Sequence, residues 1–198
     1  MSISYYEKLG NNSLCIDDDI PFEIPDSWSW CKLLNIGQSE LGKTLNGDKP
    51  IGKKAPYLCS INVYWDGIIL DNVKTTYFSD SEQDKYKLIK RDLLICEGGE
   101  SGRCAVWNSE QEMYYQNALH RVRFYSDINP YFYKYIIESY HHSGFLEGFC
   151  SGVTIKHLVK SSLHSIPLPL PPIQEQLRIV QHVKSLFSLI ESIESSLS

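Results

Sequence analysis

The sequence predicts an α/β protein of the α+β type, in which a mostly β body is followed by a long C-terminal helix of the coiled-coil type. Three observations support this class. The 198 residues are 42% hydrophobic and include 13 Tyr, 7 Phe and 4 Trp, a composition typical of a packed, sheet-rich body. The last 26 residues repeat apolar side chains at helical spacing. A proline-rich run, "IPLPLPP", separates this repeat from the body.

Residues 1–27 form a polar leader. Its six acidic side chains stand against Lys8 alone, and it ends in "IPFEIPDSW". The prolines of this stretch favour an extended backbone and disfavour a helix. We therefore expect the folded body to comprise residues 28–165.

Several segments of the body predict strands. Residues 56–70, "PYLCSINVYWDGIIL", are rich in β-branched and aromatic side chains and carry a turn signal at Asp66-Gly67. Residues 90–99 predict a short strand that ends in a glycine loop, and residues 103–108 and 117–124 predict two more strands. A last short strand is expected around residues 163–170.

One helix is predicted inside the body. Asn129 followed by Pro130 is typical of a helix start, with Asn as the cap and Pro in the first turn. Residues 131–142 continue this helix, which should end near Gly144. A second loop, "GFCSGVTIKHL" (148–158), follows it.

The tail predicts a hinge and a pairing helix. Residues 166–172 form the proline hinge, and residues 173–198 form a helix of about 39 Å at about 1.5 Å per residue. Steps of 4, 3, 3, 4, 3, 3 and 4 residues connect its apolar positions, which is the spacing of a coiled-coil seam. These positions are Ile173, Leu177, Val180, Val183, Phe187, Ile190, Ile193 and Leu197. The helix could fold back on its own body, but the prolines favour an exposed helix that needs a partner.

The charge distribution leaves a nucleic-acid partner open. The net charge is −5, and the acidic leader accounts for all of it because the remainder carries 18 basic and 18 acidic side chains. In "GKTLNGDKPIGKK", Lys43, Lys49, Lys53 and Lys54 outnumber Asp48. A charge cluster of this kind is usually a solvated loop, and it becomes a candidate phosphate-binding segment only with independent support.

Cysteine usage and hydropathy indicate a cytoplasmic protein. The six cysteines form no Cys-x-x-Cys pair and no zinc-ligand spacing, and the adjacent His141 and His142 are poorly placed as two ligands of one metal. Free thiols in a reducing compartment are therefore expected, with no metal site. No membrane span and no secretory signal are predicted.

Two glycine-containing segments are candidate ligand loops. "EGGESGRCAV" (97–106) lacks the phosphate-loop pattern, but its glycines permit close approach of a ligand, and Arg103 could reach a phosphate or a guanine edge. "SGVTIKHL" (151–158) offers polar side chains for contacts to DNA. For both segments, an ordinary loop between strands is the alternative.

No catalytic centre can be assembled. "NPYF" (129–132) resembles the amine-binding motif of amino-methyltransferases, but it lacks the second proline, and no glycine-rich cofactor loop follows an early strand. Helix capping explains these four residues more simply. No Gly-x-Ser-x-Gly sequence frames a nucleophilic serine.

Six stretches together resemble the specificity subunit of type I restriction–modification enzymes. The resemblance extends over nearly the whole chain, and the stretches that carry it are "IPFEIPDSWSW", "PYLCSINV", "RDLLICEGGESGRCAVW", "YYQNALHRVRF", "SGVTIKHL" and "SIPLPLPPIQEQLRIV". The last is the most specific, because such a run joins a target recognition domain to a long spacer helix in that family.

The resemblance implies a non-catalytic subunit whose two recognition domains each read one half of a split site in double-stranded DNA. Their helices pack antiparallel, and the modification and restriction subunits that dock on them bring S-adenosylmethionine and ATP. The present chain has one domain and one helix. It is expected either to pair with a second half, including a second copy of itself, or to be a fragment of a longer subunit.

The expected DNA-facing residues follow from loop position and chemistry. They are Lys43, Lys53, Lys54, Ser101, Arg103, Thr154 and Lys156. A bidentate contact from Arg103 to guanine would supply about 1–3 kcal/mol of discrimination. Two alternatives stay open, namely a structural adaptor that does not bind DNA and a methyltransferase fragment that uses "NPYF".

Overall fold

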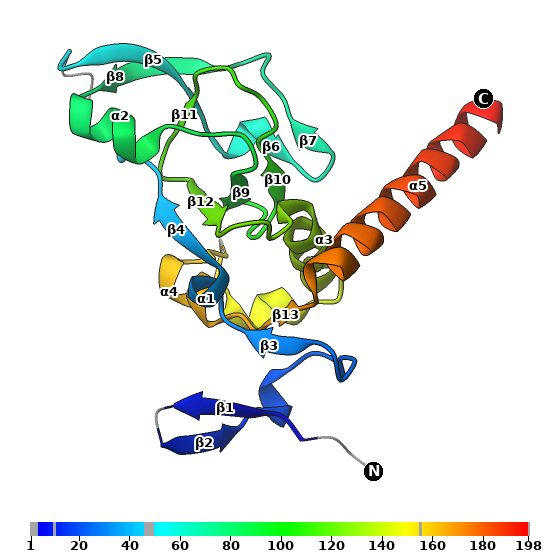
Figure 1. Ribbon diagram of the computed structural model, residues 1–198. Coiled ribbons are helices and arrows are strands. Elements are labelled where there is room, and N and C mark those ends of the chain that lie inside the picture. Colours follow the sequence, from blue (N-terminus) through cyan, green and yellow to red (C-terminus); the bar gives the residue numbers. More distant parts are fainter. Residues whose placement is uncertain (1–3, 10, 46–49, 155, 198) are drawn as a thin grey trace.

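The chain folds into a mixed α/β body from which one long helix projects (Figure 1). The computed structural model describes residues 4–9, 11–45, 50–154 and 156–197. The predicted α+β class and the C-terminal helix are confirmed. No helix within these ranges is both long and apolar enough to cross a membrane.

Thirteen strands and five α-helices are described in these ranges. The strands are β1 (Tyr6–Leu9), β2 (Asn12–Cys15), β3 (Ser29–Cys31), β4 (Gly37–Leu41), β5 (Lys53–Leu58), β6 (Val63–Tyr64), β7 (Gly67–Ile68), β8 (Lys74–Phe78), β9 (Leu93–Cys96), β10 (Cys104–Val106), β11 (Tyr114–Tyr115), β12 (Leu119–Phe124) and β13 (Leu168–Leu170). The helices are α1 (Leu33–Ile36), α2 (Asp80–Tyr86), α3 (Pro130–His142), α4 (Lys160–Ser165) and α5 (Ile173–Leu197).

Two sheets form the body. One is antiparallel with the strand order β10-β9-β12-β4, and the other has the order β11-β5-β8 with β11 parallel to β5. Three pairs of short strands, β1-β2, β6-β7 and β13-β3, complete the topology. The predicted strands at 90–99, 103–108 and 117–124 thus correspond to β9, β10 and β12.

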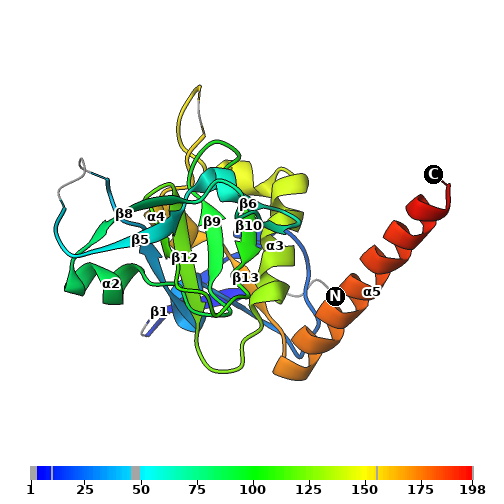
Figure 2. The same cartoon turned by 90° about the horizontal axis from the view of Figure 1, so that it is seen from above.

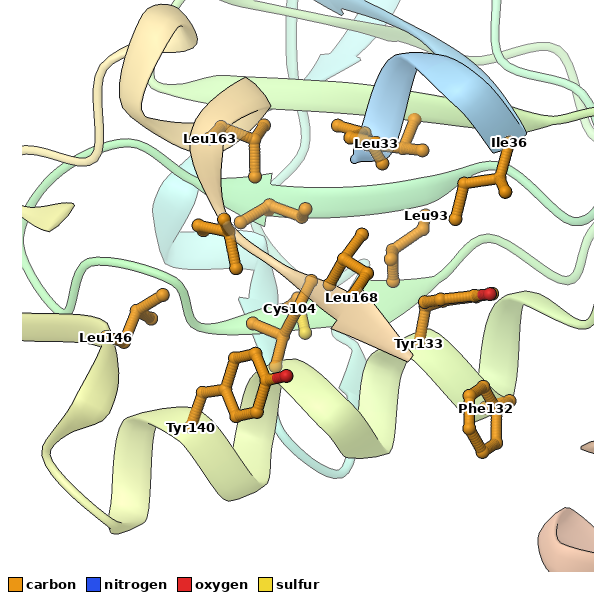
Figure 3. Packing of buried hydrophobic residues seen from close by; sticks show 14 of the residues in the cluster. Leu33, Ile36, Leu93, Cys104, Phe132, Tyr133, Tyr140, Leu146, Leu163 and Leu168 are labelled. Atoms are coloured by element: carbon orange, nitrogen blue, oxygen red, sulfur yellow. The ribbon is translucent and has the colours of Figure 1, made fainter. Parts of the chain in front are cut away.

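The strand β9 is buried on both faces, which explains its continuous apolar sequence "LLIC". Leu93 and Ile95 pack on the face covered by α3, and Leu94 and Cys96 pack on the opposite face. Figure 3 shows the first of these cores, where two tyrosines of α3 point toward Leu93 and neighbouring apolar side chains. The body therefore has a hydrophobic core on each side of its central sheet.

The helix α3 begins as the sequence predicts. The side chain of Asn129 accepts a hydrogen bond from the Tyr131 N–H at 3.0 Å, and Pro130 occupies the first turn. The helix ends before Gly144, whose φ of 79° is left-handed. The capping explanation of "NPYF" therefore accounts for the polar side chain of this motif.

The proline-rich run is bound to the body along most of its length. Residues 168–170 form β13, which pairs with β3, and the hydroxyl groups of Tyr133 and Tyr140 donate to the carbonyl oxygens of Pro169 and Pro167 at 3.2 and 2.9 Å. Proline carbonyls remain free to accept because proline lacks only the N–H. Because the run is fixed in this way, α5 begins at a defined point on the surface of the body.

A buried glutamine holds the base of α5. Gln176 has 0% of its surface exposed, accepts from the Asn129 N–H and donates to the Pro171 carbonyl oxygen, both at 2.9 Å. The first turns of α5 therefore share hydrogen bonds with the start of α3 and with the proline run. Beyond them, Figures 1 and 2 show α5 leaving the body as a straight rod.

Several elements differ from the sequence predictions. The polar leader contains the hairpin β1-β2, which we did not predict, and β8 and α2 were also missed. The turn between β6 and β7 consists of Trp65 and Asp66, so the signal at Asp66-Gly67 marks its second half and the start of β7. Residues 163–165 belong to α4, and only the later part of the predicted last strand is a strand.

Replacing Gln176 with alanine tests whether its two hydrogen bonds fix the base of α5 to the body. The variant leaves the Asn129 N–H and the Pro171 carbonyl without their partner, and each unpaired buried group costs about 1–3 kcal/mol. We expect the free energy of unfolding to fall by about 2–4 kcal/mol in chemical denaturation followed by tryptophan fluorescence. The exposed Gln174→Ala is the control, with an expected change below about 0.5 kcal/mol. Equal losses in both variants would contradict this role for Gln176.

Candidate nucleic-acid interface

Two loops that are distant in sequence meet at the end of β9. The glycine segment, residues 97–103, follows β9, and the 151–157 loop lies against it. Gly98 forms a β-bridge with His157, and the Leu158 N–H donates to the Glu97 carbonyl oxygen at 2.7 Å. The structure thus brings together the two segments that the sequence analysis selected separately.

Ser101 joins these two segments from inside the protein. Its hydroxyl group donates to the Lys156 carbonyl oxygen at 2.5 Å and lies 3.2 Å from that of Glu97. The residue is buried. Ser101 therefore orders the two loops. We expected its hydroxyl group to face a ligand, but the group is turned inward to these carbonyl oxygens.

Arg103 is likewise used within the protein. Its guanidinium group pairs with Glu100 at 3.1 Å, donates to the Ser60 carbonyl oxygen at 2.9 Å and lies over the Tyr64 ring. Only 17% of its side chain is exposed. These contacts leave Arg103 poorly placed for the bidentate guanine contact that the sequence suggested. Arg103 instead stabilises the glycine segment against the neighbouring residues 60 and 64.

The 151–157 loop projects from the body (Figure 2). Ser151 and His157 close its base through two backbone hydrogen bonds of 2.9 and 2.7 Å. Toward the tip, Val153 is fully exposed at 101%, and Thr154 and Lys156 are also exposed. Of the expected DNA-facing residues, Thr154 and Lys156 are therefore those on a protruding element.

The lysine cluster is only partly available to a ligand. Lys43 pairs with Glu82 and lies over the Phe78 ring, and the Lys53 ammonium group lies 2.7 Å from both carboxylate oxygens of Glu112. Lys54 is exposed on β5. Lys49 and Asp48 lie outside the described residues. The cluster therefore offers Lys54 and the half-exposed, paired Lys53 rather than a free basic patch.

An aromatic and histidine cluster beside the glycine segment was not predicted. The Trp65 indole N–H donates to Glu100 at 2.7 Å, and its ring lies 5.1 and 5.9 Å from the rings of His141 and His142. Burial would raise the pKa of Glu100, but hydrogen bonds from Trp65 and Arg103 hold it below its usual value. No local sequence signal links these residues, because the contacts join the β6-β7 turn to the end of α3.

The predicted pairing residues fall into two groups along α5. Near the base, Val180 is 5% exposed and belongs to the protein's own core, while Ile173 and Val183 are partly buried. The exposed members of the seam are Leu177, Phe187, Ile190, Ile193 and Leu197. Val180 must therefore be removed from the pairing stripe, because it already packs against the body.

Two exposed leucines were missed in the seam. Leu186 and Leu189 are both exposed on the projecting part of α5. Leu186, Ile190, Ile193 and Leu197 follow one another in steps of 4, 3 and 4 residues, which places them on one side of the helix. The free apolar stripe therefore starts at Leu186, and its register differs from the seam that we drew through Val180 and Phe187.

The described residues contain no group of three or more His, Cys, Asp or Glu side chains that could hold a metal ion. The six cysteines are free thiols, and burial raises the pKa of Cys31 to about 12 and that of Cys96 to about 11. Such thiols are poor nucleophiles at neutral pH.

Comparison with known proteins identifies the family. Residues 25–198 match the family described as the type I restriction modification DNA specificity domain. A curated relative, the type I restriction enzyme EcoEI specificity subunit of Escherichia coli, is 22% identical over 199 residues, covering 91% of this chain and 32% of the relative. The chain thus spans about a third of that relative's length.

Two solved structures share the fold. One is a chain described under complex assembly and conformational transition of the type I R-M system, with a TM-score of 0.69 and 17% identity, covering 89% of this chain and 42% of the other. The HsdS subunit of Thermoanaerobacter tengcongensis gives 0.64 and 15%, covering 90% and 42%. Since the family match covers most of the sequence, the chain belongs to the type I restriction–modification DNA specificity family, as its motifs predicted.

Proposed function

We propose that this chain is a non-catalytic DNA recognition module that reads one half of a bipartite site in double-stranded DNA. It would position the modification and restriction subunits of a type I system, on which S-adenosylmethionine and ATP are expected. The membership of the family and the specificity-subunit relatives support this assignment. Such a module works beside DNA, so we place it in the cytoplasm.

The observation that carries the proposal is the protruding 151–157 loop. Its base is closed by hydrogen bonds, and its exposed part carries the hydroxyl of Thr154 and the ammonium group of Lys156. A hydroxyl can donate to or accept from a base edge, and an ammonium group suits phosphate oxygens. A projection that carries these groups on a closed base fits a DNA groove, since the major groove is about 12 Å wide.

The charges of the body are consistent with a module that needs its partners to bind DNA tightly. Lys43 and Lys53 are paired with carboxylates, and Arg103 is enclosed. Three of the cations that we expected to face DNA are therefore already engaged within the protein, which reduces their part in the release of counterions, the main source of sequence-independent affinity. We expect the modification subunits to supply much of that affinity.

The projecting part of α5 supports pairing with a second recognition half. Its stripe of Leu186, Ile190, Ile193 and Leu197 is exposed in the isolated chain. A helix whose apolar side chains face water gains stability when a partner covers them. Antiparallel pairing with a second such helix, either in another copy or in another part of a longer subunit, would hold two recognition domains at a set separation.

The double variant Thr154→Ala, Lys156→Ala tests DNA reading by the loop. In cells that carry the chain and its cognate modification subunit, we expect methylation of the bipartite motif to become incomplete or less strict at one half-site. Binding to that site should also depend less steeply on salt, with the slope reduced by about 1 because one phosphate contact is lost. Genome-wide methylation mapping and salt titrations measure these effects.

Lys90→Ala is the matched control for this experiment, because Lys90 is exposed but pairs with Glu110 on another loop. It should leave the motif unchanged. If the double variant methylates the same motif as completely as the control does, the 151–157 loop does not read DNA. If no methylation depends on the chain at all, the structural-adaptor alternative is favoured instead.

Ile190→Glu and Ile193→Glu test the pairing surface. A buried glutamate on the stripe opposes association, whereas Ser188→Glu places the same charge on a residue outside the stripe. We expect the two isoleucine variants to weaken association through α5 by at least about tenfold, as measured by analytical ultracentrifugation. Unchanged association of the isoleucine variants would contradict the assignment of this stripe.

A further inference from the structure

A buried histidine reaches the C-terminal end of the 151–157 loop from the central sheet. His120 of β12 has 0% of its surface exposed, and its Nε2 atom lies 2.8 Å from the Leu158 carbonyl oxygen. A carbonyl oxygen can only accept, so Nε2 carries the ring proton and donates it. The sequence placed this residue in a predicted strand but gave no sign of a contact with the loop.

The ring is suited to a permanent structural bond. Burial lowers the pKa of His120, which keeps the imidazole neutral near neutral pH. Its Nδ1 atom is buried and has no hydrogen-bond partner among the described residues. The contact with Leu158 is therefore the one hydrogen bond that orients this side chain within the described part of the chain.

The same stretch of loop is held from the glycine segment. The Leu158 N–H donates to Glu97 at 2.7 Å, and the Ser101 hydroxyl donates to Lys156 at 2.5 Å. Residues 156 and 158 are thus fixed by three hydrogen bonds from two different elements. By contrast, Val153 and Thr154 are exposed and lie beyond the closed base.

Gly98 permits this close approach. A Cβ atom at Gly98 would lie 2.9 Å from the Cε1 and Nδ1 atoms of His157, so a larger residue would push the His157 ring away. The backbone of His157 also forms both hydrogen bonds to Ser151 that close the loop. The glycine segment is therefore shaped to receive the C-terminal side of the loop.

We infer that His120, Ser101 and Gly98 are positioning residues for DNA recognition, which set the direction of the 151–157 loop before DNA binds. The inference rests on the proposed function, in which this loop contacts DNA. A loop that is already ordered loses less conformational entropy on binding, and its side chains meet the bases in one register. We call these three residues the clamp. Loss of the clamp should therefore lower the affinity for DNA and the discrimination between correct and incorrect DNA sites.

A pair of substitutions at His120 separates positioning from overall stability. Leucine fills a similar apolar space but cannot donate to Leu158, whereas the side-chain amide of glutamine can replace the Nε2–H donor. In His120→Leu we expect amide hydrogen exchange in residues 151–158 to rise roughly five- to tenfold, in line with the loss of one buried hydrogen bond. Methylation should also spread to near-cognate sites. His120→Gln should restore both properties toward those of the unaltered chain.

Ser101→Ala provides an independent variant in case the sheet does not tolerate leucine at position 120. It removes the hydroxyl contact to Lys156 and should also speed exchange and relax the motif, while Ser188→Ala, on α5, should do neither. Melting temperatures of all variants report whether the body remains folded.

The possible outcomes distinguish this inference from the proposed function. If Thr154→Ala, Lys156→Ala alters the motif but His120→Leu and Ser101→Ala leave exchange and motif unchanged, the clamp is overturned and the proposed function stands. If the clamp variants speed loop exchange without changing the methylated motif, the loop is held as described but does not determine recognition, which also overturns the inference. A relaxed motif in both clamp variants, rescued in His120→Gln, supports it.

Discussion

The direction in which α5 leaves the body depends on one buried amide. Gln176 connects the first turn of α5 to the capped start of α3 through Asn129 and to the proline run through Pro171. Asn129 in turn caps α3, whose Tyr133 and Tyr140 hold the same proline run. The start of α3, the proline run and the first turn of α5 thus form one hydrogen-bonded unit. The helix α5 therefore cannot change direction without breaking several buried contacts.

The body and the helix have different roles. The body carries a projecting loop whose base is ordered by His120, Ser101 and the glycine segment. The helix α5 carries an exposed apolar stripe that starts at Leu186, beside the last aromatic contact of the helix with the body, between Phe187 and Tyr135. Two such chains or halves that pair through their stripes would hold two loops at a separation set by helix length. A spaced, two-part DNA site is the recognition pattern that such an arrangement favours.

Local patterns predicted α3, β9 and α5, since capping at Asn129, the continuous apolar run of β9 and the repeat in the last 26 residues each have a short-range physical cause. The roles of Arg103 and Ser101 could not be read in this way. A glycine-rich loop with an arginine suggests a ligand site. Here, however, the Arg103 guanidinium group contacts Tyr64 and Ser60, and the Ser101 hydroxyl group donates to Lys156. Only the fold brings these residues together. Val180 was assigned to the seam because spacing alone cannot distinguish a stripe that faces a partner from one that faces the body.

The fixed exit of α5 can be measured directly as a distance. Spin labels introduced at Lys54 and Ser195 through genetically encoded amino acids, in labelled chain diluted with unlabelled chain, report the separation of the body and the helix end by pulsed electron resonance. A single narrow distance distribution, broadened in Gln176→Ala, is the result we predict. A broad distribution in the unaltered chain, or a distance short enough for α5 to lie along the body, would contradict a rigidly projecting helix and with it the spacing of two recognition domains.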